Sequence, residues 1–180
     1  MSGAQEERVV LVNARDEAIG TAGKLEAHRK GLLHRAISVF IFNRKGELLL
    51  QRRAEGKYHS AGLWTNTCCS HPRENEDVAA AAVRRLKEEM GIVAPLEWRF
   101  SFTYHAHFEN GLQEHEFDHV FFGRSELTPL PDPEEVAEWR WASIDAIRGE
   151  LAADPDRFTA WFQEVWPRIE TEYASLKVDR

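Results

Sequence analysis

The residues best suited to chemistry lie between Thr65 and Ile92, where a thiol, an imidazole and several carboxylates occur close together. Cys69 stands two residues before His71, and a helix-like run follows. The charged residues of that run are Glu76, Arg85, Glu88 and Glu89. Thiols, imidazoles and carboxylates transfer protons and bind metal ions, whereas a guanidinium binds anions. The segment therefore predicts a metal ion, proton-transfer chemistry and an anionic ligand.

Three histidines extend this prediction beyond the segment. His28 and His34 lie in one predicted loop before an apolar stretch, and His71 lies beside the cysteines. A lone histidine is usually a surface or hydrogen-bonded residue, but imidazole is also the commonest metal ligand near neutral pH. Two histidines in one loop and a third next to a thiol favour a metal site, with structural histidines as the alternative.

Two carboxylates supply the second part of such a site. Glu114 and Glu116 are two residues apart, so in a strand they share one face and repel each other unless a cation lies between them. Phe117 and the apolar residues at 120–122 predict a buried strand, which raises the cost of unpaired charge. The cation would be held by His28, His34, His71, Glu114 and Glu116. These ligands suit Mn²⁺, Mg²⁺ or Zn²⁺, and a solvated strand face is the alternative.

Basic residues near predicted strand ends suggest an anion site. The candidates are Lys24, Arg52, Arg53 and Lys57. Arg53 ends a strand-like run and Lys57 lies in the loop that follows, and such loops often bind ligands. Guanidinium and ammonium groups together suit a phosphate. The alternative is a set of solvated charges, with ordinary helical ion pairing between Arg85 and Glu89, which are four residues apart.

Composition limits the classes of function. The 180 residues carry a net charge of −7, which argues against broad nucleic-acid binding but permits a small anion at a local basic cluster. No apolar run approaches the roughly 20 residues of a membrane span, and the N-terminus lacks a signal-peptide pattern, so we expect a cytoplasmic protein. Cys68 and Cys69 are adjacent, which disfavours a disulfide and indicates free thiols. We expect one domain over residues 1–180 and a monomer.

The order of predicted elements indicates the fold class. Strands are predicted at 9–13, 36–43, 47–51, 96–108 (as one or two strands), 113–123 and 136–142, with turns at 43–46 and 109–111 and a proline loop at 129–133. Helices are predicted at 76–90, from Ile144 with Ser143 as its cap, and at 158–176. In the first helix, Ala79, Val83, Leu86 and Met90 form the expected apolar stripe, and Gly91 ends it. The pattern predicts an α+β protein whose mixed β-sheet is flanked by helices.

One spacing resembles a known family motif. The run Ser70-x5-Glu76-x7-Arg84-Arg85-Leu86-x-Glu88-Glu89-x-Gly91-Ile92 is similar to the Nudix box, G-x5-E-x7-R-E-U-x-E-E-x-G-U. Ser70 replaces the opening glycine, and Arg85 replaces an acidic residue that normally helps to hold the hydrolytic metal. The second exchange disfavours pyrophosphate hydrolysis and favours a site that grips a diphosphate without cleaving it.

The wider sequence resembles the type I isopentenyl-diphosphate Δ-isomerases. The segments that carry the resemblance are GLLHRAISVFIFN, LLLQRRAEGKYHSAGLWTNTCCSHP, RRLKEEMGI and the strand with Glu114-His115-Glu116, and the resemblance covers roughly Val9 to Trp161. It implies an α/β/α-type Nudix fold with a core at about 34–165, an N-terminal extension and a C-terminal helix. The implied activity is a 1,3-allylic proton shift that interconverts isopentenyl and dimethylallyl diphosphate, so the implied partner is a small allylic or homoallylic diphosphate.

The resemblance also implies roles for individual residues. Cys69 and Glu116 would be the catalytic pair on opposite faces of the substrate. The implied metal ligands are His28, His34, His71, Glu114 and Glu116 for Mn²⁺, Zn²⁺ or Mg²⁺, and Glu89 for a Mg²⁺ that accompanies the diphosphate. The implied substrate contacts are Lys24, Arg53, Lys57 and Arg85 for the diphosphate, Trp161 for the hydrocarbon tail and Tyr104 near the acid. Cys68 would serve packing.

The chemistry expected of this pair requires an acid, a base and a dry pocket. Protonation of an unactivated double bond creates a carbocation, which Trp161 would stabilise through a cation–π contact. We expect nearby cations and His71 to lower the pKa of Cys69 so that it acts as a thiolate. The alternatives are a Nudix pyrophosphohydrolase acting on a nucleoside diphosphate derivative and a non-catalytic Nudix-like binding module. Neither gives a use to Cys69 or to the histidine and glutamate cluster.

Overall fold

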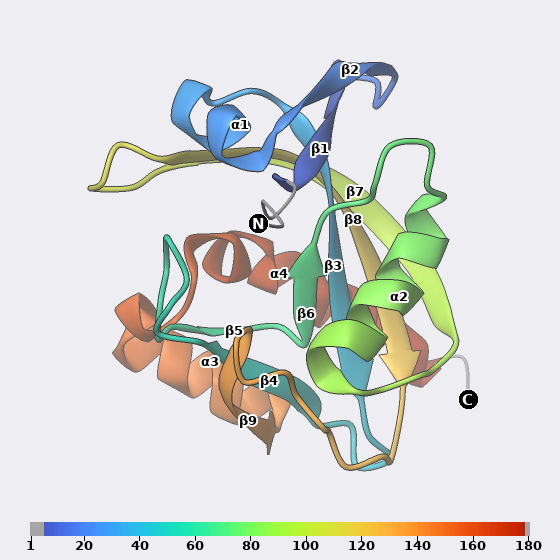
Figure 1. Ribbon diagram of the computed structural model, residues 1–180. Coiled ribbons are helices and arrows are strands. Elements are labelled where there is room, and N and C mark those ends of the chain that lie inside the picture. Colours follow the sequence, from blue (N-terminus) through green and yellow to red (C-terminus); the bar gives the residue numbers. More distant parts are fainter. Residues whose placement is uncertain (1–5, 179–180) are drawn as a thin grey trace.

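A computed structural model describes residues 6–178 of the chain as a mixed nine-stranded sheet with helices on both faces (Figure 1). The strands are β1 (Arg8–Val12), β2 (Ala18–Gly23), β3 (His34–Phe42), β4 (Leu48–Arg53), β5 (Trp64–Thr65), β6 (Cys68–Ser70), β7 (Leu96–His107), β8 (Gln113–Arg124) and β9 (Val136–Ala142). The helices are α1 (Lys24–Lys30), α2 (Val78–Met90), α3 (Ile144–Ala153), the 3₁₀ turn η1 (Pro155–Arg157) and α4 (Ala160–Val178). The predicted α+β class is confirmed.

The centre of the sheet is the parallel pair of β3 and β8, which runs in register from His34–Glu116 to Phe42–Arg124. All other strand pairs are antiparallel, among them β6 with β3 and the long β7–β8 hairpin. The register places Cys69 beside Ser38 on β3. Segments far apart in the sequence, at the starts of β3 and β8 and at the end of β6, therefore meet at one end of the sheet.

Alternation along β3 separates two hydrophobic cores. Ile37, Val39 and Ile41 face α2, whereas Phe40 and Phe42 face α3 and α4. Successive strand residues point to opposite faces, so the two neighbouring cysteines divide in the same way. Cys68 is fully buried under α2, and Cys69 packs on the α4 side. Both thiols are free, as predicted, and Cys68 serves packing.

Helix α2 ends at Met90 as predicted, begins at Val78 rather than at Glu76, and buries a different face. The Asp77 carboxylate caps the first turn by accepting from the Ala80 amide at 2.9 Å, and Gly91 ends the helix with φ 65°. Two members of the predicted stripe, Ala79 and Val83, are exposed, while Leu86 and Met90 are buried. The helix is rotated relative to the predicted orientation. Its buried face also includes Ala81, Ala82 and Glu89, a charged residue that the predicted apolar stripe did not contain. The predicted stripe was therefore half wrong.

The N-terminal part differs most from the prediction. Residues expected to form a loop around His28 instead make the strand β2 and the seven-residue helix α1, and His34 is the first residue of β3. Gly23 caps this helix without a side-chain hydrogen bond. The helix is only seven residues long, so its apolar periodicity is too short to be recognised in the sequence. The signal-peptide prediction begins at residues 1–5, which lie outside the described residues.

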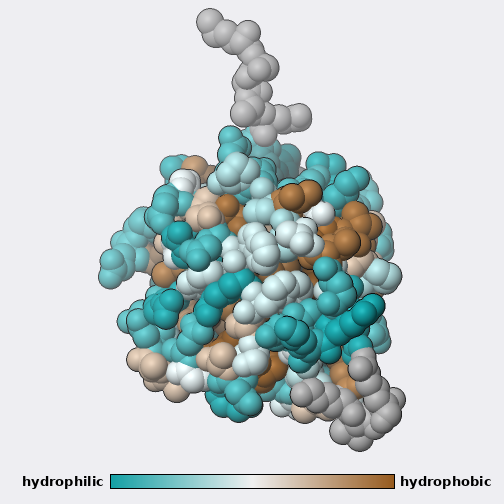
Figure 2. All heavy atoms as spheres, turned by 90° about the horizontal axis from the view of Figure 1, so that it is seen from below, coloured by the Kyte–Doolittle hydropathy of each residue, from teal (hydrophilic) through white to brown (hydrophobic). Residues whose placement is uncertain are grey.

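Most of the remaining elements follow the prediction closely, but the short strands β5 and β6 were not predicted. Residues 96–107 form one continuous strand with an irregularity between Trp98 and Phe100, the turn at 109–111 joins it to β8, and Ser143 caps α3. Among residues 6–178, no helix is both long and apolar enough to cross a lipid bilayer. On the face seen in Figure 2, hydrophobic residues are interspersed with hydrophilic ones.

Candidate metal and catalytic site

Three predicted metal ligands converge at the end of the sheet. His28 comes from α1, His34 from the start of β3 and His71 from the residue after β6. Their ring centroids lie 5.1 Å apart for His28–His34, 5.0 Å for His34–His71 and 6.0 Å for His28–His71. Glu116 joins them from β8, and one ligand atom from each of these four residues lies within 4.8 Å of the others. The structure therefore brings together four of the residues that were predicted to bind a metal.

Backbone carbonyls orient two of the imidazoles. His28 Nδ1 lies 2.6 Å from the Lys24 carbonyl, and His34 Nδ1 lies 2.8 Å from the Leu32 carbonyl. A carbonyl oxygen only accepts, so Nδ1 must donate and Nε2 faces the cluster in both rings. Metal-binding histidines are commonly fixed by this kind of hydrogen bond.

The donor set fits a divalent cation. His28 Nε2 and Glu114 Oε2 are buried and have no hydrogen-bond partner among residues 6–178, although buried polar atoms are normally paired. A cation between the imidazoles and the carboxylates would satisfy both. Nitrogen and oxygen donors of this kind suit Mn²⁺, Zn²⁺ or Mg²⁺. The described cluster is therefore able to hold a metal ion.

Electrostatics support the same conclusion. Burial lowers the pKa of His28 and of His71 to about 4, so both rings are neutral at pH 7 and offer a lone pair. Burial opposes the charged forms of His34 and Glu116, but their mutual contact at 3.4 Å outweighs it. The contact with Glu116 raises the pKa of His34. The same contact, together with the His71 hydrogen bond at 3.1 Å, lowers the pKa of Glu116 well below its usual range. Glu116, His28 and His71 are thus in the forms that bind metals, whereas any proton on His34 would be released when a metal binds.

Glu114 lies on the same buried face of β8 as Glu116, as their spacing predicted. Its nearest partner is His59, which the sequence analysis missed: His59 Nε2 lies 2.9 Å from Glu114 Oε1. His28, His59 and Glu114 form a second group of ligand atoms that lie within 4.8 Å of one another. The only available signal was the position of His59 inside the segment KYHSAG that already carried the family resemblance.

Cys69 lies in the same cavity as Glu116, together with His71 and Trp161. The thiol donates to Asn66 Oδ1 at 3.0 Å and accepts from Trp161 Nε1 at 3.1 Å. Asn66 is itself fully buried and donates to the carbonyls of Val39 and Cys68, so its oxygen is held toward the sulfur. The sequence analysis missed Asn66 because an asparagine in a motif gives no indication of its contacts.

The predicted thiolate character of Cys69 is wrong. Burial, followed by the nearby Asp118 carboxyl, raises the pKa of the Cys69 thiol far above its ordinary value. The partners of the sulfur are neutral groups rather than the cations that the sequence analysis expected. Asp118, a third buried carboxyl on the face of Glu114 and Glu116, accepts from Ser38 Oγ at 2.6 Å, and burial also raises its pKa.

The four predicted diphosphate contacts line this cavity as well: Lys24, Arg53, Lys57 and Arg85. Three of them have acidic partners, with Nζ–O distances of 2.8 Å for Lys24–Glu7 and 2.6 Å for Lys57–Glu135, and 2.7 Å between Arg85 and Glu89. Burial raises the pKa of Glu89, which also lines the cavity but lies outside the histidine cluster.

The two departures from the Nudix box contact each other. Arg85 Nε donates to Ser70 Oγ at 2.7 Å, so the serine that replaces glycine holds the arginine that replaces an acid. The same guanidinium binds Glu88 at 2.6 Å and Glu89 at 2.7 Å. Arg85 therefore already binds the carboxylates of Glu88 and Glu89 in the motif.

Trp161 and Tyr104 differ in their access to the cavity. Trp161 lines it, and the Arg53 guanidinium lies 5.2 Å from its ring. Tyr104 is 2% exposed and stands opposite Glu116 in the β7–β8 hairpin, and it is not among the residues that line the cavity. Burial and the charges of Glu114 and Glu116 raise the pKa of its hydroxyl.

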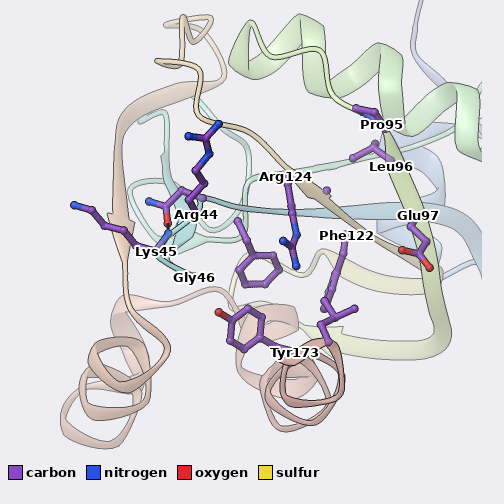
Figure 3. A pocket seen from close by; sticks show the side chains of 13 residues that line it. Arg44, Lys45, Gly46, Pro95, Leu96, Glu97, Phe122, Arg124 and Tyr173 are labelled. Atoms are coloured by element: carbon purple, nitrogen blue, oxygen red, sulfur yellow. Dashed lines mark hydrogen bonds between the residues drawn. The ribbon is translucent and has the colours of Figure 1, made fainter. Parts of the chain in front are cut away.

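The cavity is narrow, at about 40 Å³, and a larger one of about 580 Å³ lies elsewhere (Figure 3). The larger cavity is lined by Phe122 and Tyr173, with Arg44 and Arg124 among its cations. Its described lining residues include no histidine or cysteine and only one acid, Glu97. It offers no acid–base pair, so the smaller cavity remains the candidate site.

Comparisons with known proteins agree with this geometry. Residues 32–162 match the family model of the NUDIX domain. A crystal structure of a Deinococcus radiodurans protein has a similar fold, with a TM-score of 0.73 at 21% identity over 90% of this chain and 98% of that one. A MutT NUDIX hydrolase from Burkholderia pseudomallei gives a TM-score of 0.60 at 20% identity over 75% and 96% of the two chains.

The curated relatives are closer. A protein of Aromatoleum aromaticum named isopentenyl-diphosphate Delta-isomerase 1 is 51% identical over 91% of this chain and 93% of its own. An isopentenyl-diphosphate Delta-isomerase of Serratia proteamaculans is 52% identical over 87% of this chain and 88% of its own. The chain therefore belongs to the NUDIX family and, within it, to the isopentenyl-diphosphate Delta-isomerases.

Proposed function

We propose that the protein interconverts isopentenyl and dimethylallyl diphosphate by a metal-dependent 1,3-allylic proton shift. The observation that carries the proposal is one narrow cavity that contains the Cys69 thiol, the Glu116 carboxylate of the histidine cluster and four cations. The shift needs two proton-transfer groups, and the cations suit a diphosphate. The names of the curated relatives agree with this activity.

In the proposed reaction, Cys69 and Glu116 each handle one proton. One of them delivers a proton to the terminal carbon of the double bond, and the other removes a proton from the carbon on the far side of the developing cation. By microscopic reversibility, the acid of one direction is the base of the other. Trp161 borders the same cavity, where its ring stabilises the developing positive charge by about 2 kcal/mol when water is excluded.

His28, His34, His71, Glu114 and Glu116 would hold the cation of the site, with Mn²⁺, Zn²⁺ or Mg²⁺ as candidates. A bound divalent cation would stabilise negative charge on Glu116 and so set how readily this carboxyl gives up its proton. Glu89 would bind a Mg²⁺ that accompanies the diphosphate. For Glu89 to bind this ion, Arg85 would have to release the Glu89 carboxylate and turn toward the phosphates.

The cations position a nearly featureless five-carbon tail. Lys24, Arg53, Lys57 and Arg85 would bind the diphosphate, so that binding energy remote from the reacting carbons orients them. Tyr104, which stands opposite Glu116 on β7, would restrict the movement of this carboxylate. Exclusion of water from the reacting carbons matters as well, because water would otherwise capture the cation.

The alternative, pyrophosphate hydrolysis of a nucleoside diphosphate derivative, has less support. Its motif needs an acid where this chain has Arg85, and that arginine already binds Glu88 and Glu89. A hydrolase would also leave Cys69 and the histidine cluster without a role.

An activity assay separates these functions. Purified protein with Mg²⁺ and Mn²⁺ should convert isopentenyl diphosphate to dimethylallyl diphosphate, as followed by proton NMR, and release no phosphate from nucleoside diphosphate derivatives. Release of phosphate products together with unchanged isopentenyl diphosphate would instead support the hydrolase.

A further inference from the structure

His59 is a buried imidazole beside the histidine cluster, and the carboxylate that it contacts is Glu114 rather than Glu116. Its Nε2 lies 2.9 Å from Glu114 Oε1, whereas His28 Nε2 lies 4.0 Å from the same oxygen. The other oxygen, Glu114 Oε2, is buried and has no hydrogen-bond partner among residues 6–178. A carboxylate held through one oxygen in this way presents the second as a free ligand atom.

The His59 ring is fixed by its surroundings. It stacks on Phe108 of the β7–β8 hairpin, with centroids 4.8 Å apart and an interplanar angle of 8°, and meets the edge of Tyr58 at 4.7 Å. Ser60 Oγ lies 3.2 Å from Nδ1, and a hydroxyl that donates there leaves the ring proton on Nε2, facing the carboxylate. Ser60 has φ 52°, a conformation that a non-glycine residue adopts only where the surroundings enforce it.

We infer that His59 is a positioning residue of the metal site, which holds Glu114 through an Nε2–H to Oε1 hydrogen bond so that Oε2 is the ligand atom. The inference rests on the metal-dependent function proposed above. A nitrogen that donates a proton to the carboxylate has no lone pair for the ion, so His59 supports a ligand rather than being one. Partners of this kind typically change metal affinity by 10–100-fold.

The same bond ties a loop to the metal cluster. Lys57, a proposed diphosphate contact, lies two residues before His59 in the connection between β4 and β5. Arg53 Nη2 also donates to the His59 carbonyl at 3.2 Å. His59 therefore links the metal side of the cavity to two of the cations that bind the diphosphate.

Titration of Mn²⁺ alone into the protein by isothermal calorimetry tests the inference without any need for turnover. The variants are His59→Phe, which keeps the flat ring on Phe108 but has no donor, and His59→Gln, whose side-chain amide reaches the position of Nε2. His59→Asn, which is too short to reach Glu114, is a second removal variant should the phenylalanine variant not fold. His107→Phe, an exposed histidine of β7, is the matched control for loss of an imidazole.

The expected result is a 10–100-fold rise of the Mn²⁺ Kd for His59→Phe and for His59→Asn. The Kd of His59→Gln should stay within about threefold of the wild type because the donor is retained, and His107→Phe should match the wild type. A wild-type Kd in the removal variants, or an equal loss in the glutamine variant, would overturn the positioning role. Failure of the wild type to bind Mn²⁺ would instead count against the metal site of the proposed function.

Discussion

At the scale of single residues, the site depends on how the sulfur of Cys69 is held. It donates to Asn66 and accepts from Trp161, and both partners are buried. A neutral thiol with one donor and one acceptor partner has a defined orientation, which suits an exchange of one proton with a carbon atom. The same surroundings make the thiolate costly.

Alkylation measures this cost. Because the pKa of Cys69 is raised, the thiol stays protonated at and above neutral pH, and the thiolate that reacts with iodoacetamide appears only in strongly alkaline solution. We expect the alkylation rate of Cys69, followed by mass spectrometry, to keep rising above about pH 10. The urea-unfolded protein is the control, and its rate should level off at about pH 10, since the ordinary cysteine pKa is about 8.5. A plateau below pH 8 in the folded protein would show a lowered pKa instead.

Most residues of the proposed site were predicted from the sequence, but the residues that hold them in place were not. His28, His34, His71, Glu114 and Glu116 follow from spacing and from the family resemblance, and the structure brings them together. His59, Asn66 and Asp118 act through contacts between distant segments, with hydrogen-bond partners up to 95 residues away in the sequence. No local pattern marks such residues. The direction of the Cys69 pKa shift was also wrong, because burial and the nearby carboxyl of Asp118 both raise this pKa.

At the scale of elements, α2 carries both core and site. Leu86 and Met90 pack under the sheet, while Arg85 and Glu89 enter the cavity. The start of the helix is fixed by the Asp77 carboxylate, which accepts from Ala80. A change at this cap should lower stability without touching the cavity.

Asp77→Ala should lower the free energy of unfolding by about 1 kcal/mol, because the first turn loses its cap. Urea denaturation of wild type and variant measures the difference. Glu74→Ala removes a charge of the same sign from an exposed position before the helix and should change stability little. Equal effects of the two substitutions would mean that charge, rather than capping, stabilises α2.

The predictability of elements followed their length. The long strands β7 and β8 and the helices α2, α3 and α4 have enough periodicity to be recognised. The strands β5 and β6 have two and three residues, and α1 has seven, so their conformation depends on tertiary pairing rather than on local pattern. The predicted orientation of α2 was wrong at Val83, which is exposed, because the buried face of the helix includes the Glu89 carboxylate.

At the scale of the whole molecule, the metal cluster joins segments that are distant in the chain. Its ligands come from α1, the start of β3, the end of β6 and β8. The parallel pairing of β3 with β8 places His34 directly opposite Glu116. An ion bound there would connect the N-terminal elements to the centre of the sheet, so binding should stabilise the native state as a whole.

At a Mn²⁺ concentration 100 times the Kd, the free energy of unfolding should rise by about 2.7 kcal/mol, since the ion binds only the folded chain. Thermal unfolding with Mn²⁺ and with EDTA measures the shift. His34→Gln should lose most of it because one of the cluster's imidazoles is gone. An unchanged melting temperature in EDTA for the wild type would contradict a metal site at this place.

The most direct measurement is solvent-deuterium incorporation by the wild type and two variants. In D₂O with Mg²⁺ and Mn²⁺, wild-type protein should turn isopentenyl diphosphate into dimethylallyl diphosphate that carries deuterium, as seen by NMR. Cys69→Ala and Glu116→Gln, with circular dichroism spectra like the wild type, should each abolish both conversion and labelling. Full conversion by either variant, or unlabelled product from the wild type, would contradict a reaction in which this thiol and this carboxylate each transfer one proton.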